Sequence, residues 1–227
     1  MSFEASYTSG ATSARVTAGR VTLSAWGAPV AVVQVAEDAP VPASGVLVLG
    51  DFSQVMTVEK SGPYGGSRGI WLVGGANGWR KTIRRQFYSD PQGVKLAAVL
   101  KDAAQLAGER VALSAAFSGR VLGQFWSREE APASRSLALT VGASWWIDPL
   151  GVTQIGERPT VPISVDFDPV SPIRPELGSY TIATEDLLPW VPGATFTKPG
   201  ILDDVLTISS VSIVFGTKLR LEVLVNL

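Results

Sequence analysis

The chain has 227 residues and contains no cysteine and no histidine. The lack of cysteine excludes disulfides, thiolate nucleophiles and cysteine metal sites. The lack of histidine removes the commonest general base, the commonest zinc ligand and the usual partner of a catalytic serine. An enzyme with this sequence would depend on carboxylates, lysine or tyrosine. We therefore expect a protein that is not an enzyme and that has no cofactor or metal.

Long hydrophobic runs are also missing. No stretch of about 20 apolar residues could span a bilayer, and the N-terminal sequence MSFEASYTSGATSARV lacks the basic and apolar regions of a signal peptide. We expect no membrane insertion and a protein that is soluble and cytoplasmic when it is made. The apolar fraction of 46% is nevertheless enough for a substantial core.

Charged residues are scarce, and they are unevenly spread along the chain. Residues 60–101 hold eight basic side chains against Asp90 alone, a net charge of +7. Residues 157–204 hold eight acidic and three basic side chains, a net charge of −5. This asymmetry predicts two surfaces with different neighbours, although solvated faces with no partner are the alternative interpretation.

The basic segment WRKTIRRQF, residues 79–87, is predicted to be a strand with basic side chains on its exposed face. Its candidate contact residues, for a partner protein or another subunit, are Arg80, Lys81, Arg84 and Arg85. Charge alone would also permit a nucleic-acid patch. A protein contact or a solvated face is the better interpretation.

An amphipathic helix is predicted over residues 91–108. Ser89 or Asp90 is a candidate N-cap, Pro91 suits the first turn, and Gly108 can adopt the left-handed conformation that ends a helix. The apolar positions recur at the helical period and form one buried face: Leu96, Val99, Leu100, Ala103 and Ala107. We expect this helix to be a structural anchor, with Pro91, Leu96, Leu100 and Gly108 in structural roles.

Most of the remaining sequence has β patterning. Short apolar runs bounded by proline and glycine begin at Arg15, and the strands predicted at 54–60 and 68–74 form a hairpin with a glycine-rich tip. Further short strands are expected around residues 121–126, and a second, shorter helix over 133–142. The sequence SWWIDPLGVTQIG predicts a hairpin with a turn at DPLG, in which Trp145 and Trp146 have structural roles.

The C-terminal segment is predicted to be a long hairpin over residues 205–215 and 218–225. Its alternation implies one covered face, and we expect Ile208, Ile213 and Phe215 to contribute to a subunit interface. The predicted fold class is mainly β with two short helices (α+β), in two small domains that resemble barrels or sandwiches. The predicted divisions are a flexible arm at 1–14, a first domain at 15–110 and a second at 111–227.

Motifs for catalysis and ligand binding are weak. The acidic pairs Glu129–Glu130, Asp166/Asp168, Glu185–Asp186 and Asp203–Asp204 lie beside turns or strand starts, where acids are usually solvated. The last two aspartates together with Asp166 and Asp168 could bind calcium, but the spacing of an EF-hand is missing. The glycine-rich sequences GPYGGSRG and GGANG lack the lysine of a phosphate-binding loop.

Two blocks of sequence resemble baseplate or tail hub proteins of tailed bacteriophages, a family related in fold to the hubs of contractile injection machines. In the first block, a strand leads into a helix through Pro91, Gly93, Val94 and Leu96, and the helix ends in the sequence Ala107–Glu109. In the second, a short helix ends at a glycine before an aromatic hairpin, matched by Gly142, Trp145, Trp146, Asp148, Gly151 and Gly156. The Pro-Gly turn Val191-Pro192-Gly193 follows in a final β segment.

The resemblance implies a structural role in the virion. Three copies would form a ring that joins the tail tube or a distal tail protein to the proteins that bear the spike or fibres. DNA would pass transiently through its lumen, and the protein would reside in the tail baseplate after assembly in the host cytoplasm.

Three alternatives remain open from the sequence. One is another tail component, either a distal tail protein or a spike adaptor. Another is a carbohydrate-binding module that uses Trp71, Trp79 or Trp145. The third is a hydrolase that works with carboxylates alone.

Overall fold

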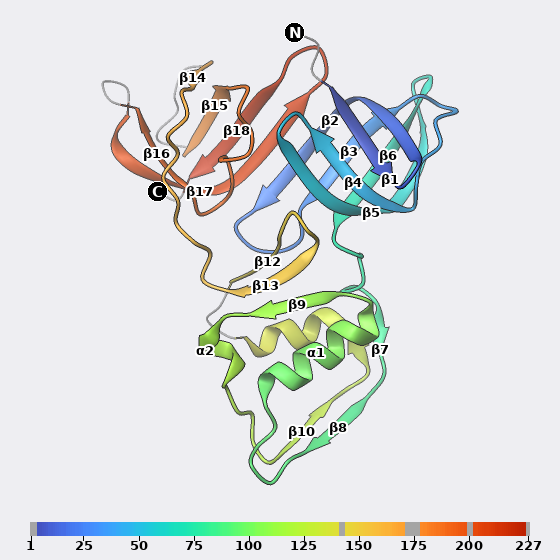
Figure 1. Cartoon of the computed structure of the whole chain (residues 1–227), viewed down its shortest axis with the longest axis vertical. Helices are drawn as coiled ribbons and strands as arrows, with labels where there is room; N and C mark the ends of the chain where they lie inside the picture. The colour runs from blue at the N-terminus through green and yellow to red at the C-terminus, as the bar shows by residue number, and fades with distance from the viewer. Residues whose placement is uncertain (1–3, 141–143, 171–177, 199–201, 226–227) are drawn as a thin grey trace. The chain divides into compact units, whose positions relative to one another are not determined.

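The computed structural model describes residues 4–140, 144–170, 178–198 and 202–225. The chain forms two compact units (Figure 1). Unit 1 consists of residues 1–74 and 158–227, and unit 2 consists of residues 75–157. The predicted boundary near residue 110 is therefore wrong. It follows local sequence patterns, whereas unit 1 is built by pairing strands from opposite ends of the chain.

The N-terminal part of unit 1 is a closed six-stranded barrel, drawn in blue and cyan in Figure 1. Its strands are β1 (Ala5–Ser9), β2 (Thr12–Ser24), β3 (Val30–Val35), β4 (Ser44–Leu49), β5 (Phe52–Tyr64) and β6 (Ser67–Gly74). They follow the order β1-β4-β5-β6-β3-β2, and the pairing of β1 with β2 closes the barrel. The hairpin predicted at 54–60 and 68–74 is confirmed as β5 and β6.

Residues 4–14 belong to this barrel, so the prediction of a flexible arm over 1–14 is wrong for all the residues described there. Ala5, Tyr7 and Ala14 are buried, and the Tyr7 hydroxyl donates a 2.9 Å hydrogen bond to the carbonyl of Met56. The small polar residues between them point outward, as the period of a strand requires. The segment is polar because only one of its faces is buried.

A second sheet extends from the barrel through β2. Its further strands are β14 (Asp168–Pro169), β15 (Ser179–Ala183), β16 (Thr195–Lys198), β17 (Leu202–Phe215) and β18 (Arg220–Val225). β2 pairs with β1 through residues 12–15 and with β17 through residues 19–24, so a single strand belongs to both sheets. The predicted C-terminal hairpin is confirmed as β17 and β18.

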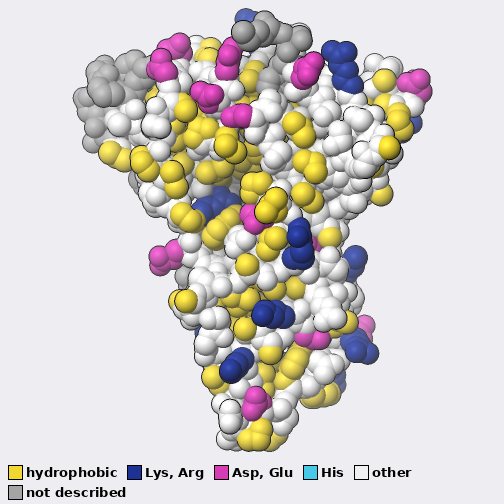
Figure 2. Space-filling view, viewed as in Figure 1, with side chains coloured by type: hydrophobic (Ala, Val, Ile, Leu, Met, Phe, Trp, Pro, Cys, Tyr) yellow, Lys and Arg dark blue, Asp and Glu magenta, His cyan; other side chains and the backbone are white. Residues whose placement is uncertain are grey.

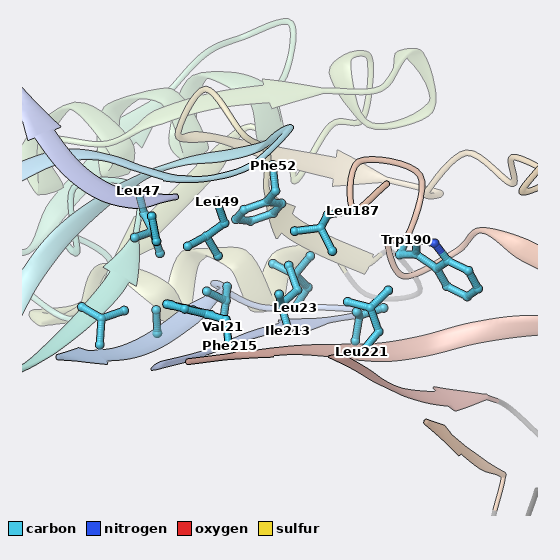
Figure 3. Close-up of a cluster of buried hydrophobic side chains, with 14 of the residues drawn as sticks. Val21, Leu23, Leu47, Leu49, Phe52, Leu187, Trp190, Ile213, Phe215 and Leu221 are labelled. Atoms are coloured by element: carbon cyan, nitrogen blue, oxygen red, sulfur yellow. The ribbon is translucent and has the colours of Figure 1, made fainter. Parts of the chain in front are cut away.

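The core of unit 1 combines side chains from both ends of the chain. Figure 3 shows Val21 of β2 and Leu47 of β4 in the same apolar cluster as Ile213 of β17, with Trp190 at one side. The Asp51 carboxylate accepts hydrogen bonds of 3.0 Å from the backbone N–H groups of Leu187 and Leu188. This contact fixes the loop that supplies Trp190 to the end of the barrel.

Unit 2 surrounds one helix with short strands. Its elements are β7 (Thr82–Ile83), β8 (Gln86–Ser89), α1 (Leu96–Ala107), β9 (Arg110–Leu113), α2 (Ala115–Ser118), β10 (Phe125–Arg128), β11 (Ala131–Pro132), the 3₁₀ helix η1 (Ala133–Leu139), β12 (Ser144–Ile147) and β13 (Val152–Gly156). β7 pairs with β11, β8 with β10, and β13 lies between β12 and β9. No helix among the described residues is long and apolar enough to cross a membrane.

Helix α1 confirms the predicted buried face and C-terminus but not the predicted start. All five predicted apolar positions are buried, and Gly108 ends the helix with φ = 79°. The helix begins at Leu96, not at residue 91, and neither Ser89 nor Asp90 caps it. Gly93 has φ = 99°, outside the helical region, and Asp90 instead accepts a hydrogen bond from the N–H of Gln92. Pro91 therefore lies in a turn before the helix.

The second block of the sequence also folds nearly as expected. The DPLG turn joins β12 to β13, with Gly151 at φ = 75° and its N–H bonded to the Asp148 carbonyl. The predicted second helix is a 3₁₀ helix that ends at Leu139, and Gly142, its predicted end, lies outside the described residues. The strand predicted at 121–126 is β10, which lies slightly later in the chain.

Candidate interaction surface

The ribbon formed by β8 and β10 has two faces of different character. Tyr88, Trp126 and Arg128 alternate onto the partly covered face, whereas Phe87 and Phe125 point outward with exposed fractions of 69% and 77%. Two exposed phenylalanines on one face of a ribbon are typical of a surface that binds protein, since aromatic side chains are enriched at interfaces. We call these two residues the aromatic face.

The covered face of this ribbon is joined to α1 by a charged network. Arg128 Nη1 lies 2.8 Å from Asp102 Oδ2 and 2.8 Å from the Tyr88 hydroxyl, which donates to the same carboxylate at 2.5 Å. Arg128 is 8% exposed. Burial and the hydrogen bond to Asp102 raise the pKa of the Tyr88 phenol well above its usual value. The tyrosine therefore remains a neutral donor.

The four basic residues predicted from the sequence are all exposed in unit 2, where Lys81 and Arg85 make the following contacts. Lys81 Nζ donates a 3.0 Å hydrogen bond to the Ala107 carbonyl at the end of α1, where a cation is favoured. Arg85 lies 3.6 Å from Glu129 and its guanidinium is 5.6 Å from the centre of the Phe87 ring. Arg85 thus connects the basic segment to the aromatic face.

Unit 2 as a whole is basic and unit 1 is acidic. Unit 2 contains ten basic and seven acidic residues, and unit 1 contains nine basic and thirteen acidic residues. Figure 2 shows Asp and Glu side chains predominating on the visible face of unit 1 and Lys and Arg side chains spread over that of unit 2. Most of the basic segment lies in unit 2, and most of the acidic segment lies in unit 1.

A small cavity lies beside β10, β11 and η1. Its volume is about 160 Å³, and its polar lining residues are Arg128, Glu129, Arg135 and Ser136, with Trp126 and Leu139 among the apolar ones. Arg128 Nε and Ser136 Oγ are buried and have no hydrogen-bond partner among the described residues. No local sequence pattern indicates this cavity, because it depends on how η1 packs beside the ribbon.

The other predicted interface residues do not lie on a surface. Ile208, Ile213 and Phe215 are 1%, 0% and 5% exposed and belong to the core of unit 1. Their prediction as interface residues is wrong, because the covered face of the terminal hairpin packs within its own chain. β17 pairs with β2, which lies almost 200 residues earlier.

The three tryptophans predicted for a carbohydrate-binding module, Trp71, Trp79 and Trp145, are all at least partly buried. Trp79 is buried, and its Nε1 donates a 2.7 Å hydrogen bond to Thr153 Oγ1. Lys60 Nζ lies over the Trp71 ring, 4.9 Å from its centre, so the ammonium group covers part of one face of that ring. Trp145 and Trp146 are half-buried in β12.

The predicted acidic pairs are exposed wherever their side chains are described. This holds for Glu129–Glu130, Asp166/Asp168 and Glu185–Asp186, whereas the side chains of Asp203 and Asp204 lie outside the described part. Within the described ranges, no group of three or more side chains could hold a metal ion. A groove of about 1090 Å³ in unit 1 is lined by four acidic side chains and two basic ones: Glu4, Asp166, Asp168, Glu185, Arg15 and Lys218.

No protein-family model and no curated protein matches the chain. Solved structures of tail proteins do. The 43 kDa tail protein of prophage MuSo2 from Shewanella oneidensis has a TM-score of 0.68 and 13% identity, over 100% of this chain and 98% of that one. The tail protein from Neisseria meningitidis MC58 has a TM-score of 0.64 and 15% identity, over 99% and 96%.

A third structure comes from a secretion machine. The Escherichia coli c3393 protein has a TM-score of 0.62 and 11% identity, over 97% of this chain and 76% of that one. It is described as a component of the type VI secretion system that is structurally similar to the T4 tail proteins gp27 and gp5. The chain therefore has the fold of phage tail proteins along its whole length, which confirms the predicted fold class and the predicted resemblance.

Proposed function

We propose that this chain is a structural tail protein that acts as the baseplate or tail hub. The observation that carries this proposal is that tail proteins from two different bacteria have the same fold over at least 96% of both chains. A match of that extent includes both units and the connections between them. It is more specific than a shared barrel, which occurs in proteins of many functions.

In this proposal three copies form a ring. One face of the ring meets the tail tube or a distal tail protein, and the other carries the proteins of the spike or fibres. DNA passes through the lumen without lasting contact, and acidic side chains near the lumen would keep it from binding. The role is structural, and the proposal includes no catalysis and no cofactor.

The basic and aromatic residues of unit 2 are the proposed contact with a neighbouring protein. Arg80, Lys81, Arg84 and Arg85 supply positive charge, and the aromatic face supplies apolar area beside it. Phenylalanine and arginine are both enriched at protein interfaces, and arginine is among the residues that dominate binding energy there. An acidic neighbouring surface would complement this one in charge.

The experiment that tests the function is an in-frame deletion of the gene in the phage or prophage that encodes it. We expect particles that lack a complete tail tip and are not infectious, and we expect plasmid expression of the protein to restore both. Normal tails with full infectivity in the deletion strain would contradict the proposal.

A second candidate is the equivalent hub in a bacterial secretion machine. The similarity to the type VI secretion component favours it, because that protein has the same fold over 97% of this chain. The two candidates differ in what the deletion removes. Loss of contractile secretion from a strain that makes no phage particles would favour the secretion machine.

A further inference from the structure

The backbone of β8 points half of its hydrogen-bonding groups away from β10. The Asp90 N–H donates a 3.0 Å hydrogen bond to the Gln124 carbonyl, so these two residues form a hydrogen-bonded pair where the ribbon ends. In an antiparallel ladder such pairs alternate with pairs that are not hydrogen-bonded. The register therefore makes Phe87 and Ser89 members of the second kind of pair, with their backbone groups directed to the outer edge of β8.

This outer edge has almost no hydrogen-bond partners. The N–H groups of Phe87 and Ser89 and the Ser89 carbonyl make no hydrogen bond with any described residue, and the Phe87 carbonyl accepts one of 3.1 Å from the side-chain amide of Gln86. Among the described strands, β10 alone pairs with β8. Phe87 and Ser89 are both exposed. Unpaired backbone groups along an exposed strand are a template for a further strand.

We infer that an extended segment of a partner protein adds to the ribbon as a third strand along β8. The backbone edge selects a polypeptide, because another extended chain supplies N–H and C=O groups at the same spacing, whereas a phosphate chain offers acceptors only. The inference deepens the proposed function, on which it rests for the nature of the partner, a neighbouring tail protein.

The side chains beside this edge indicate which residues the added strand carries. Arg85 lies on the same face of the ribbon as Phe87, since its guanidinium is 5.6 Å from the centre of that ring and 3.6 Å from Glu129. Phe87 is 69% exposed, and the Arg85 side chain is 59% exposed. Residues of an added strand that lie beside these two share one face and are two positions apart. We expect an acidic residue beside Arg85 and an apolar residue beside Phe87.

The charge of the ribbon favours such a segment. Residues 80–90 and 124–130 together hold five basic and three acidic side chains. The ion pair of Arg85 with Glu129 is exposed on both sides, so it contributes little to stability, and the guanidinium can also bond to an incoming carboxylate. A segment with an acidic and an apolar residue in alternation therefore complements this edge in charge and in apolar area.

A proline at the edge tests the backbone contact. Ser89→Pro removes an outward N–H that the β8–β10 ladder does not use, and Ser89→Ala keeps this N–H. Ser127→Pro makes the same change on the outer edge of β10 and is the second control. We expect all three variants to have the urea midpoint of the wild type. Only Ser89→Pro should lower incorporation into tails in the complementation assay, by about tenfold, since one hydrogen bond is lost.

Equal incorporation of Ser89→Pro and Ser89→Ala would overturn the inference, and so would a loss with Ser127→Pro instead. Hydrogen exchange of the wild-type protein gives the answer if Ser89→Pro unfolds. The amides of Phe87 and Ser89 should exchange fast in the free protein and slowly in purified tails, with Tyr88, whose amide faces β10, as the internal reference. Equal exchange in both samples would contradict strand addition.

A photo-cross-linker identifies the occupant. With p-benzoylphenylalanine in place of Phe87, purified tails should give a cross-link to another tail protein, in a segment that has an acidic residue two positions from the linked one. A product of about 48 kDa from two copies of this chain, or a linked segment without that acidic residue, would overturn the assignment.

The deletion strain separates this inference from the proposed function. Normal tails in the absence of the protein would contradict the proposed function. Tails that the wild-type protein restores, and that incorporate Ser89→Pro as well as Ser89→Ala, would contradict strand addition alone.

Discussion

Arg128 of β10 donates a 2.8 Å hydrogen bond to Asp102 of α1, and this pair connects the two-stranded ribbon to the central helix of unit 2. The arginine is 8% exposed and also bonds to Tyr88 and to the Arg84 carbonyl. Removing one partner of a buried ion pair leaves the other charge without its counter-charge.

We expect Arg128→Ala to lower the free energy of unfolding by about 3 kcal/mol, because Asp102 would lose its cation in a partly buried site. Arg85→Ala is the matched control, since its pair with Glu129 is exposed and should contribute less than about 1 kcal/mol. Urea unfolding of both variants is the measurement. Equal losses would contradict the account of the network.

Gly19 lies where β2 leaves the barrel and joins the second sheet. A Cβ atom there would lie 2.6 Å from the Val32 carbonyl oxygen and 2.9 Å from the Phe215 ring. We expect Gly19→Ala to destabilise the protein by about 1 to 3 kcal/mol through overpacking. Gly62→Ala in β5 meets no atom within 4 Å and should be close to neutral. Thermal unfolding of the two variants compares them, and a neutral Gly19→Ala would count against a tight junction.

We expect the buried phenol of Tyr7 to make the folded protein less stable at alkaline pH. Burial raises its pKa from 10.0 to about 12, because the phenolate is poorly solvated inside the barrel. Because the pKa of Tyr7 is higher in the folded state, the neutral phenol contributes fully to the free energy of unfolding below pH 10. This contribution is lost as the pH rises to 12.

Tyr7→Phe should therefore lose about 1 kcal/mol at pH 7, where the hydrogen bond to Met56 is missing, and decline less steeply than wild type between pH 10 and 12. Tyr64→Phe removes a hydroxyl from an exposed tyrosine and is the control. Chemical unfolding across this pH range is the test. Parallel curves for wild type and Tyr7→Phe would refute the assignment.

We expect substitutions on the proposed contact surface to leave folding normal but to impair assembly of the protein into tails. Phe125 is 77% exposed and Arg84 is exposed, so Phe125→Ser and Arg84→Glu should change the free energy of unfolding by less than about 0.5 kcal/mol. Both should reduce the incorporation of the protein into tails in the complementation assay. Ser53→Glu, at an exposed position of the barrel in unit 1, is the control. Full incorporation of both variants would remove this surface from the proposal.

A helix end or a turn can be predicted from the sequence where the residues that form it are adjacent in the chain. Gly108 ends α1 as its residue type predicts, and the DPLG sequence makes the turn between β12 and β13. The start of α1 was mispredicted because Pro91 and Asp90 suit a helix start and a turn equally well. Gly93, with a positive φ, decides between the two.

Long-range features were not predictable from one sequence. The pairing of Gly19 with Phe215 joins opposite ends of the chain, and no local pattern reports it. For the same reason Ile208 and Ile213 were mistaken for interface residues, since alternation shows that a face is covered but not what covers it. The basic segment was visible in the sequence, whereas the cavity with Arg128 and Ser136 required the fold.

The mass of the purified protein in solution, measured by light scattering and followed by negative-stain images, tests the proposed hub most directly. Three chains of 23.9 kDa give a particle of about 72 kDa, which we expect as the main species, with a central hole in the images. A monomer of about 24 kDa at every concentration, with no ring in the images, would contradict the proposal that this chain forms the hub by itself.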